Sequence, residues 1–430
     1  MVEFQHIRRV VEAKVSQGAF LSGMMHVARK QSSQTQKSFV DQLSGIAATV
    51  RGVLETNDLI GRVEYRPQKF WPAVRGKAIT FLDGGVANIE LPSAAPVGIR
   101  VGSYTVRPGE HDPLARERFS IDLSIVDDLY SEEGYLYDSD FLDFAKLRDA
   151  ARIVSETAAV LQHATRLQPA DAILLHGPLI NPVSPYGLEG FPPFGLGASR
   201  QLLGDEAWEG GENERQFVAL YLLILERIRD TDRLVMGVVE RSLGTEPVVI
   251  HRLLDSLQDA GVMKKDNVKA LLESLRLYGL NDAAILDVVL QEGEFTKPAP
   301  IDRQGPESKW PTEWTQWIRT FPKALTSYLK PSELTSPFRI EAFEGTKGLT
   351  EAIDLVLHTA RLLPSYGFPV GLDIVDKFAK VPEWMSRGIR GQHQIVLLQK
   401  AIESGDPRAV AFAKRVLAAK GRDWFFRPTA

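Results

Sequence analysis

The alternation of apolar and polar residues predicts that the chain begins with helices and then changes to strands. Apolar positions recur at helical spacing through residues 1–57, which we therefore expect to be helical. KAITFLDGG (77–85) contains β-branched and aromatic residues and stops at two glycines, as a buried strand does. ANIELP (87–92) and GIRVGSYTV (98–106) follow at short spacing. These three segments predict an antiparallel meander of strands.

A long helix and a further strand follow the meander. Residues 141–166 carry an apolar stripe at helical spacing, formed by Leu147, Ala151, Val154, Ala158 and Leu161. AILLH (172–176) is typical of a buried strand. In a β-β-β-α-β order the last strand can pair parallel to the first, with the helix as a right-handed crossover. The pattern therefore predicts an α/β fold with a mixed sheet.

The remainder of the chain is predicted to be mainly helical, with two more strands. The strands are expected at 234–242 and in SPFRIEAFEG (336–345), and a last helical region begins near residue 350. We divide the chain into an N-terminal helical segment (1–70), a central domain (71–385) with a helical insertion at about 200–330, and a basic C-terminal helical tail (386–430).

Composition limits the chemistry that this chain can carry out. It has no cysteine, which excludes disulfides, thiol nucleophiles and Cys-ligated zinc, so any metal must be held by Asp, Glu or His. The longest strongly apolar run, FVALYLLIL (217–225), is about half of a bilayer span. The N-terminus lacks the apolar core of a signal peptide. We therefore expect a cytoplasmic protein that binds no membrane.

The charge of the chain restricts how it can bind a polyanion. Its 51 Lys and Arg against 55 Asp and Glu give a net charge of −4, so a polyanion must meet a local basic patch. From residue 377 to the C-terminus there are eleven basic residues and four acidic ones. A nucleic-acid or partner surface and a solvated pair of terminal helices both fit this pattern.

Four titratable residues are candidates for chemistry. Asp83 ends a buried strand before two glycines, although Asp-Gly is also a common turn. His176 ends the strand expected beside it, so the two side chains would form the start of a metal site. Glu156 lies opposite the apolar stripe of its helix, so it faces either solvent or a cleft at the sheet edge, and the sequence alone favours solvent. Asp376 is the fourth candidate, and Asp373 on the same helical face is its rival.

Taken together, these segments resemble the NurA nucleases, a family that works with the hexameric HerA ATPase on DNA ends. The resemblance covers about residues 77–385 and rests on FLDGG, the helix with Arg152 and Glu156, ILLHGPL, VMGVVERS, SYLKPSELTSPFRIEAF and YGFPVGLDIVDKFAKV, in that order. It implies an RNase H-like core in which carboxylates at strand tips hold manganese or magnesium. By resemblance, Asp83 is the first-strand ligand and Glu156 the helix ligand.

Three positions depart from the family pattern. His176 stands where the family has Asp, Asp376 where it has His, and Phe368 where it has Tyr. The first two changes are reciprocal, so the inventory of metal ligands is unchanged if both side chains face the same metal site. We therefore expect Asp83, Glu156, His176 and Asp376 to be the catalytic metal ligands of a two-metal site for Mn²⁺ or Mg²⁺. Imidazole suits manganese better than magnesium.

Phe368, Arg339 and Glu341 are candidates for lining that site. Arg339 and Glu341 lie two residues apart in FRIEAF, on one face of a predicted strand. An ion pair along the strand explains them more simply.

The resemblance implies a metal-dependent exo- or endonuclease that hydrolyses DNA phosphodiesters. It also implies a homodimer that acts with a HerA-like hexameric ATPase in DNA end processing or anti-phage defence. The alternative is a scaffold that binds DNA and the ATPase without cutting, because three family site positions differ. The aromatic run WFFRP (424–428) is expected to dock on its own domain or on a partner.

Overall fold

The computed structural model describes residues 2–87, 96–128, 144–188, 190–191, 216–240, 246–277, 279–304 and 310–418. The chain divides into two compact units, one formed by Met1–Leu59 with Gly244–Leu290 and the other by Ile60–Leu243 with Gln291–Ala430. Residues 88–92 of the predicted second strand and the WFFRP segment lie outside the described residues.

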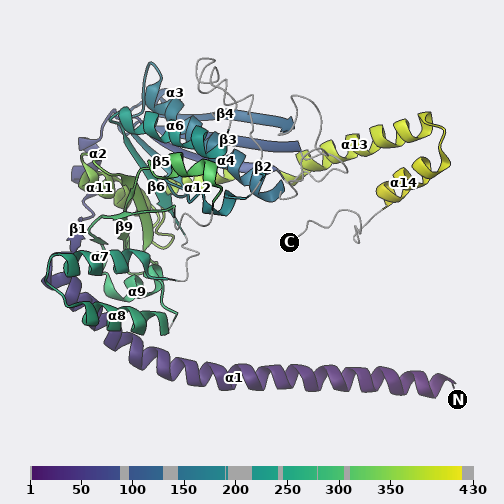
Figure 1. Cartoon of the computed structure of the whole chain (residues 1–430), viewed down its shortest axis with the longest axis horizontal. Coiled ribbons are helices and arrows are strands. Elements are labelled where there is room, and N and C mark those ends of the chain that lie inside the picture. Colours follow the sequence, from purple (N-terminus) through teal and green to yellow (C-terminus); the bar gives the residue numbers. More distant parts are fainter. Residues whose placement is uncertain are drawn as a thin grey trace. The chain divides into compact units, whose positions relative to one another are not determined.

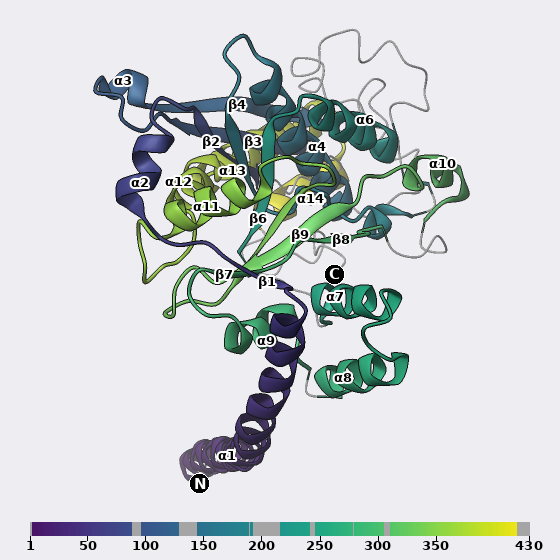
Figure 2. The same ribbon diagram turned by 90° about the vertical axis from the view of Figure 1, so that its left-hand side faces the viewer.

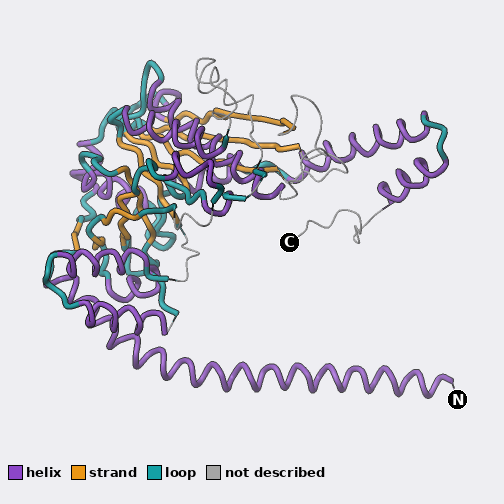
Figure 3. Tube along the Cα trace, viewed as in Figure 1, coloured by secondary structure: helices purple, strands orange, loops and turns teal. Residues whose placement is uncertain are grey.

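The first unit is helical, as the sequence predicts for 1–57 and for the segment before residue 290. It contains α1 (Val2–Thr56), α7 (Val248–Asp259), α8 (Lys265–Leu277) and α9 (Asp282–Val289). Figure 3 shows α1 as one continuous helix. The Asp282 carboxylate accepts hydrogen bonds from the Val249 and Ile250 N–H groups, both at 2.9 Å. It thereby satisfies two of the donors that a helix N-terminus leaves unpaired.

The second unit contains one mixed sheet. In the part of the chain that the structure describes, the strand order is β1-β7-β9-β10-β6-β5-β2-β3-β4, and β8 pairs with β9. The strands are β1 (Ile60–Arg62), β2 (Ile79–Ala87), β3 (Pro96–Val106), β4 (Glu117–Asp128), β5 (Ala172–His176), β6 (Leu234–Val239), β7 (Glu294–Thr296), β8 (Ala299–Ile301), β9 (Ala324–Leu329) and β10 (Phe338–Phe343).

The centre of this sheet has the predicted RNase H-like arrangement. The strands β2, β3 and β4 form an antiparallel meander and run side by side in Figures 1 and 2. The helix α4 (Phe144–Thr165) then leads to β5, which pairs parallel to β2, and β6 pairs parallel to β5. The predicted order β-β-β-α-β and the parallel pairing of its first and last strands are therefore confirmed.

One strand of the meander differs from the sequence prediction. Among the described residues its third strand is β4, which the sequence prediction omitted, and GIRVGSYTV lies in the second strand, β3. Among the strands that the structure describes, β4 pairs only with β3, at the edge of the sheet, and Phe119 and Ile121 on it are exposed. The segment FSIDLSI (119–125) of β4 alternates strictly between apolar and polar residues, so the strand pattern is present in the sequence although the prediction did not use it.

Helices cover both faces of the sheet. α4 and α6 (Phe217–Asp230) pack on one face, and α11 (Leu349–Ala360) and α12 (Val370–Ala379) pack on the other. Because side chains alternate along a strand, Leu82 and Leu175 enter the first core, whereas Phe81 and Leu174 enter the second. Each such buried side chain contributes about 2 kcal/mol to the free energy of unfolding.

Shorter elements and the C-terminal helices complete the second unit. These are α2 (Pro67–Ala73), α3 (Pro113–Arg116), α10 (Thr315–Ile318), the 3₁₀ turns Ser184–Tyr186 and Thr312–Trp314, α13 (Glu383–Glu403) and α14 (Pro407–Ala418). Among the helices in the described ranges, none combines the length and the apolar character that crossing a bilayer requires.

Candidate metal centre

Asp83 and His176 are brought together by the parallel pairing of β2 and β5. Leu82 lies opposite Leu175 in the register. The residues that follow them, Asp83 and His176, therefore lie side by side on neighbouring strands. His176 Nδ1 lies 3.2 Å from Asp83 Oδ2, and Asp83 is buried. The Gly84 N–H donates to Asp83 Oδ1 at 2.8 Å and holds the carboxylate in place.

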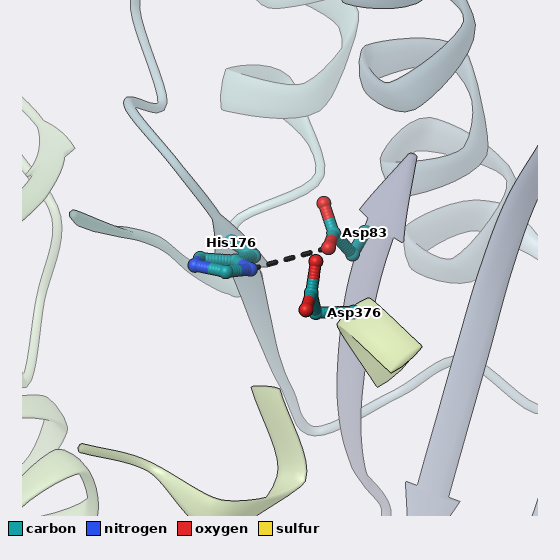
Figure 4. A group of neighbouring side chains, drawn as sticks. All are labelled: Asp83, His176 and Asp376. Carbon is teal, nitrogen blue, oxygen red and sulfur yellow. Dashed lines mark hydrogen bonds and ion pairs between the residues drawn. The ribbon is translucent and has the colours of Figure 1, made fainter. Parts of the chain in front are cut away.

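Asp376 of α12 joins these two side chains. One ligand atom of Asp83, one of His176 and one of Asp376 all lie within 4.8 Å of one another, and Figure 4 shows the three side chains directed toward a common point. The rival Asp373 is not in this group. It accepts a hydrogen bond from the Tyr366 hydroxyl at 3.1 Å and pairs with Lys377 at 2.5 Å.

Two glycines bring α12 close enough to the sheet for this meeting. A Cβ on Gly371 of α12 would lie 2.4 Å from the Phe81 ring of β2. A Cβ on Gly85 would lie 2.5 Å from the Ala379 carbonyl oxygen at the end of α12. Both distances are too short for a real side chain, so the absence of a Cβ permits the contact. This close packing of α12 on the sheet brings Asp376 near β2.

Nearby carboxylates raise the pKa of the His176 imidazole. Burial lowers the pKa of this imidazole, but the hydrogen bond and the charge of Asp83, with the charges of Asp376 and Glu240, outweigh burial and raise it. The centroid of the Phe368 ring lies 5.4 Å from the centroid of the His176 imidazole, so Phe368 restricts the orientation of the imidazole.

The donors of this group suit a divalent cation. Two carboxylates and one imidazole supply oxygen and nitrogen ligands, which Mn²⁺ accepts readily and Mg²⁺ accepts less readily because of the imidazole. A cation would compete with a proton for the His176 imidazole, because a ligating imidazole must be neutral.

Glu156 is buried, so the prediction that its side chain faces solvent is wrong. It is 4% exposed, because its side chain faces the sheet at β2. Its carboxylate lies against the backbone of Gly84, where a Cβ would be 2.4 Å from Oε1. Arg152 donates to both of its oxygens, at 2.7 and 2.9 Å. Glu156 does not belong to the group of Asp83, His176 and Asp376.

Because Glu156 is buried, its contribution to the free energy of unfolding depends on pH. Burial raises its pKa to about 7, although the charge of Arg152 acts in the opposite direction. A carboxyl group whose pKa is raised by folding stabilises the protein below its ordinary pKa of 4.5 and loses that contribution as the pH rises through about 7.

We therefore expect Glu156→Gln to gain stability relative to the parent as the pH rises. Glutamine stays neutral, so the difference in unfolding free energy between the variant and the parent should increase by about 2 kcal/mol from pH 5 to pH 8. Urea denaturation of both proteins in chelator-containing buffer measures this difference. A difference that stays constant over that range would contradict a raised pKa at Glu156.

Arg339 and Glu341 lie beside the chain segment that follows His176. Glu341 is fully buried on β10, and its Oε2 accepts the Leu179 N–H at 3.1 Å. Arg339 Nε lies 2.9 Å from Glu341 Oε1, and Arg303 pairs with the same oxygen. The ion pair along the strand is therefore present, and these contacts hold the turn after His176. Neither residue belongs to the three-residue group.

Two nearby residues were not selected from the sequence. Glu240 directly follows β6, the strand beside β5, and its charge is one of those that raise the pKa of His176. It occupies the end of its strand as His176 does, and that position could have identified it. Tyr366 precedes Phe368 by two residues, and no local pattern indicated that its hydroxyl would reach Asp373.

The comparison with protein families identifies the relationship that this geometry suggests. A family model described as the NurA domain matches residues 77–381, which include all four predicted ligands. The chain belongs to the NurA family. No curated protein matches the chain closely enough to be counted as a relative.

Several solved structures are similar to this NurA-family chain. The NurA nuclease from Sulfolobus solfataricus is 12% identical, with a TM-score of 0.46 over 86% of this chain and 97% of that one. A NurA crystal structure with manganese is 13% identical, with a TM-score of 0.41 over 86% and 98% of the two chains. Human ENDOV is 12% identical, with a TM-score of 0.28 over 79% and 96%.

Proposed function

We propose that this NurA-family protein is a divalent-metal-dependent nuclease that hydrolyses DNA phosphodiester bonds. The observation that carries the proposal is the convergence of Asp83, His176 and Asp376 from two strands and a helix, with ligand atoms within 4.8 Å of one another. Family membership supplies the reaction class, and this donor set fits the metal that such a reaction requires.

The chain's own residues would bind the cation and fix its position. Asp83 and Asp376 would supply oxygen ligands, and His176 a nitrogen ligand. The Gly84 N–H and the Phe368 ring would keep Asp83 and His176 from rotating away. A bound divalent cation supplies Lewis-acid stabilisation of charge on the phosphodiester and favours a nucleophilic water at neutral pH.

A second cation would require Glu156 as a further ligand. The charges of Asp83 and Glu156 interact, so the two carboxylates are near each other, but Arg152 holds both Glu156 oxygens. We infer that a two-metal site forms only after Arg152 releases at least one of them. Asp149 also accepts from Arg152, at 2.6 Å, and would keep the guanidinium in place when this happens.

The biological setting that we propose follows from family membership. The protein would act on single-stranded DNA or duplex ends as a homodimer with a HerA-like hexameric ATPase. DNA end processing and anti-phage defence are both consistent with this activity. The basic helices α13 and α14 offer cationic residues to a polyanion or a partner, among them Arg387, Lys400 and Arg408.

Incubation of the purified full chain with linear or single-stranded DNA tests the proposal. We expect degradation with Mn²⁺, weaker degradation with Mg²⁺ because of the imidazole ligand, and none with excess chelator. Glu117→Gln, on the exposed part of β4, is the control variant and should cut as the parent does. Absence of degradation at high protein concentration, with the ATPase present, would contradict the nuclease.

The alternative function is a NurA-like scaffold that binds DNA and the ATPase without cutting. The departures at His176, Asp376 and Phe368 favour it. The same preparation distinguishes the two functions, because a scaffold would bind DNA and stimulate or anchor the ATPase while leaving the DNA intact in Mn²⁺.

A further inference from the structure

A lysine ammonium contacts the candidate metal centre. Lys380 directly follows α12, and its Nζ lies 2.6 Å from Asp376 Oδ2. The hydrogen bond with Asp376 raises the pKa of Lys380, and the charge of Asp83 acts in the same direction. The group is therefore an ammonium at neutral pH, next to two of the three residues that would bind a cation.

The backbone of Lys380 is fixed, whereas its ammonium is accessible. A Cβ on Gly85 would lie 3.0 Å from the Lys380 Cα and 2.5 Å from the carbonyl oxygen of Ala379, so β2 packs directly against this point of the chain. The Lys380 side chain is nevertheless 66% exposed, against 26% for Asp376. An anchored stem with an exposed end can exchange one anionic partner for another without movement of the helix.

Lys377 provides an internal comparison. Its Nζ lies 2.5 Å from Asp373, four residues earlier on the same helix, and its side chain is 69% exposed. The spacing, distance and exposure match those of the Lys380 pair. Asp373, however, is not in the group of Asp83, His176 and Asp376. The two lysines therefore differ in whether the carboxylate that they contact belongs to the candidate centre.

We propose that Lys380 is the resident counter-ion of Asp376, that it gives up this carboxylate when a divalent cation binds, and that its ammonium then contacts a DNA phosphate. The inference rests on the proposed nuclease function. A divalent cation attracts Asp376 more strongly than an ammonium does, and two cations beside one carboxylate repel each other. The released ammonium lies next to the centre and suits a phosphate, which lysine binds as a point charge.

Lys380→Met tests the proposal, with Lys377→Met as the matched control. Methionine keeps an unbranched stem and removes the charge. In calorimetric titration we expect Lys380→Met to bind Mn²⁺ about two- to threefold more tightly than the parent does. This size of effect reflects the modest strength of an exposed ion pair. The gain should shrink at high salt because exposed charges are screened.

The second measurement is steady-state cleavage at saturating Mn²⁺. We expect Lys380→Met to raise the KM for single-stranded DNA by about fivefold, through the loss of one charge-assisted phosphate contact. Lys377→Met should leave both the Mn²⁺ affinity and this KM unchanged. A purely structural role for Lys380 would not tighten Mn²⁺ binding.

The possible outcomes separate this inference from the proposed function. Mn²⁺ affinity equal to that of the parent in Lys380→Met, or an equal gain in Lys377→Met, would overturn the counter-ion role. Tighter Mn²⁺ binding with an unchanged KM would overturn the phosphate contact. If Asp83→Asn abolishes Mn²⁺ binding while Lys380→Met has no effect, only the inference fails. If Asp83→Asn leaves Mn²⁺ binding unchanged, the metal centre and the inference fail together.

Discussion

Asp83→Asn is expected to reduce Mn²⁺-dependent DNA cleavage by about a thousandfold, equivalent to about 4 kcal/mol of transition-state stabilisation. Asp83 is the buried member of the three-residue group, and it contacts His176 directly. Asparagine keeps the size of the side chain but removes its charge, so a cation loses its most enclosed oxygen ligand. Rates of release of acid-soluble nucleotides from linear DNA measure the effect.

Asp373→Asn is the control for this prediction. Asp373 is a carboxylate of α12 that binds Tyr366 and Lys377 and lies outside the group. We expect its replacement to change the rate by less than about threefold, as is usual for exposed ion pairs. Unchanged circular dichroism and a thermal midpoint close to that of the parent would show that Asp83→Asn is folded. Equal losses in the two variants would contradict a specific role for Asp83.

The second large effect is expected from exchanging His176 and Asp376. His176→Asp alone would place three carboxylates together, and Asp376→His alone would leave one carboxylate with two imidazoles. Each single variant is therefore expected to lose Mn²⁺ affinity and cleavage rate by roughly a hundredfold, at the upper end of what a perturbed metal shell costs. The double variant restores two carboxylates and one imidazole, in the arrangement of the family pattern.

We expect the double variant to recover most of the activity lost by either single variant. Residues that share one ligand shell are coupled, so their effects should be strongly non-additive. Calorimetric titration with Mn²⁺ and the cleavage assay, applied to the parent and all three variants, measure this coupling. If the losses of the two single variants simply multiply in the double variant, the two positions do not exchange roles and the idea of a reciprocal substitution is wrong.

Local patterns were sufficient to predict the position of Asp83 relative to His176. Each residue ends an apolar run of strand character, and a helix with an apolar stripe lies between the runs. Because a right-handed crossover makes such strands parallel neighbours, the two side chains were expected to meet, and they lie 3.2 Å apart. Every step of that prediction uses either residues adjacent in sequence or a general rule of chain connection.

The roles of Asp373 and Asp376 could not be assigned in this way. The two carboxylates lie three residues apart on one helix, so periodicity treats them almost alike. The contacts of Gly371 with Phe81 and of Gly85 with Ala379 set the rotation and height of α12 on the sheet, and these contacts bring Asp376 rather than Asp373 to the group. They join residues almost three hundred positions apart, so no local pattern records them.

The sequence by itself thus determined the strands β2, β3, β5, β6 and β10, the crossover helix and the pairing of an acid with a histidine at two strand ends, because these depend on short-range periodicity and chain handedness. Only the tertiary structure decided that Glu156 is buried, since its burial depends on the packing of α4 against Gly84 of β2. It also decided that Asp376 and its partner Lys380 lie at the centre. Packing between distant segments controls exposure and side-chain direction, and a residue's own neighbours in sequence do not specify that packing.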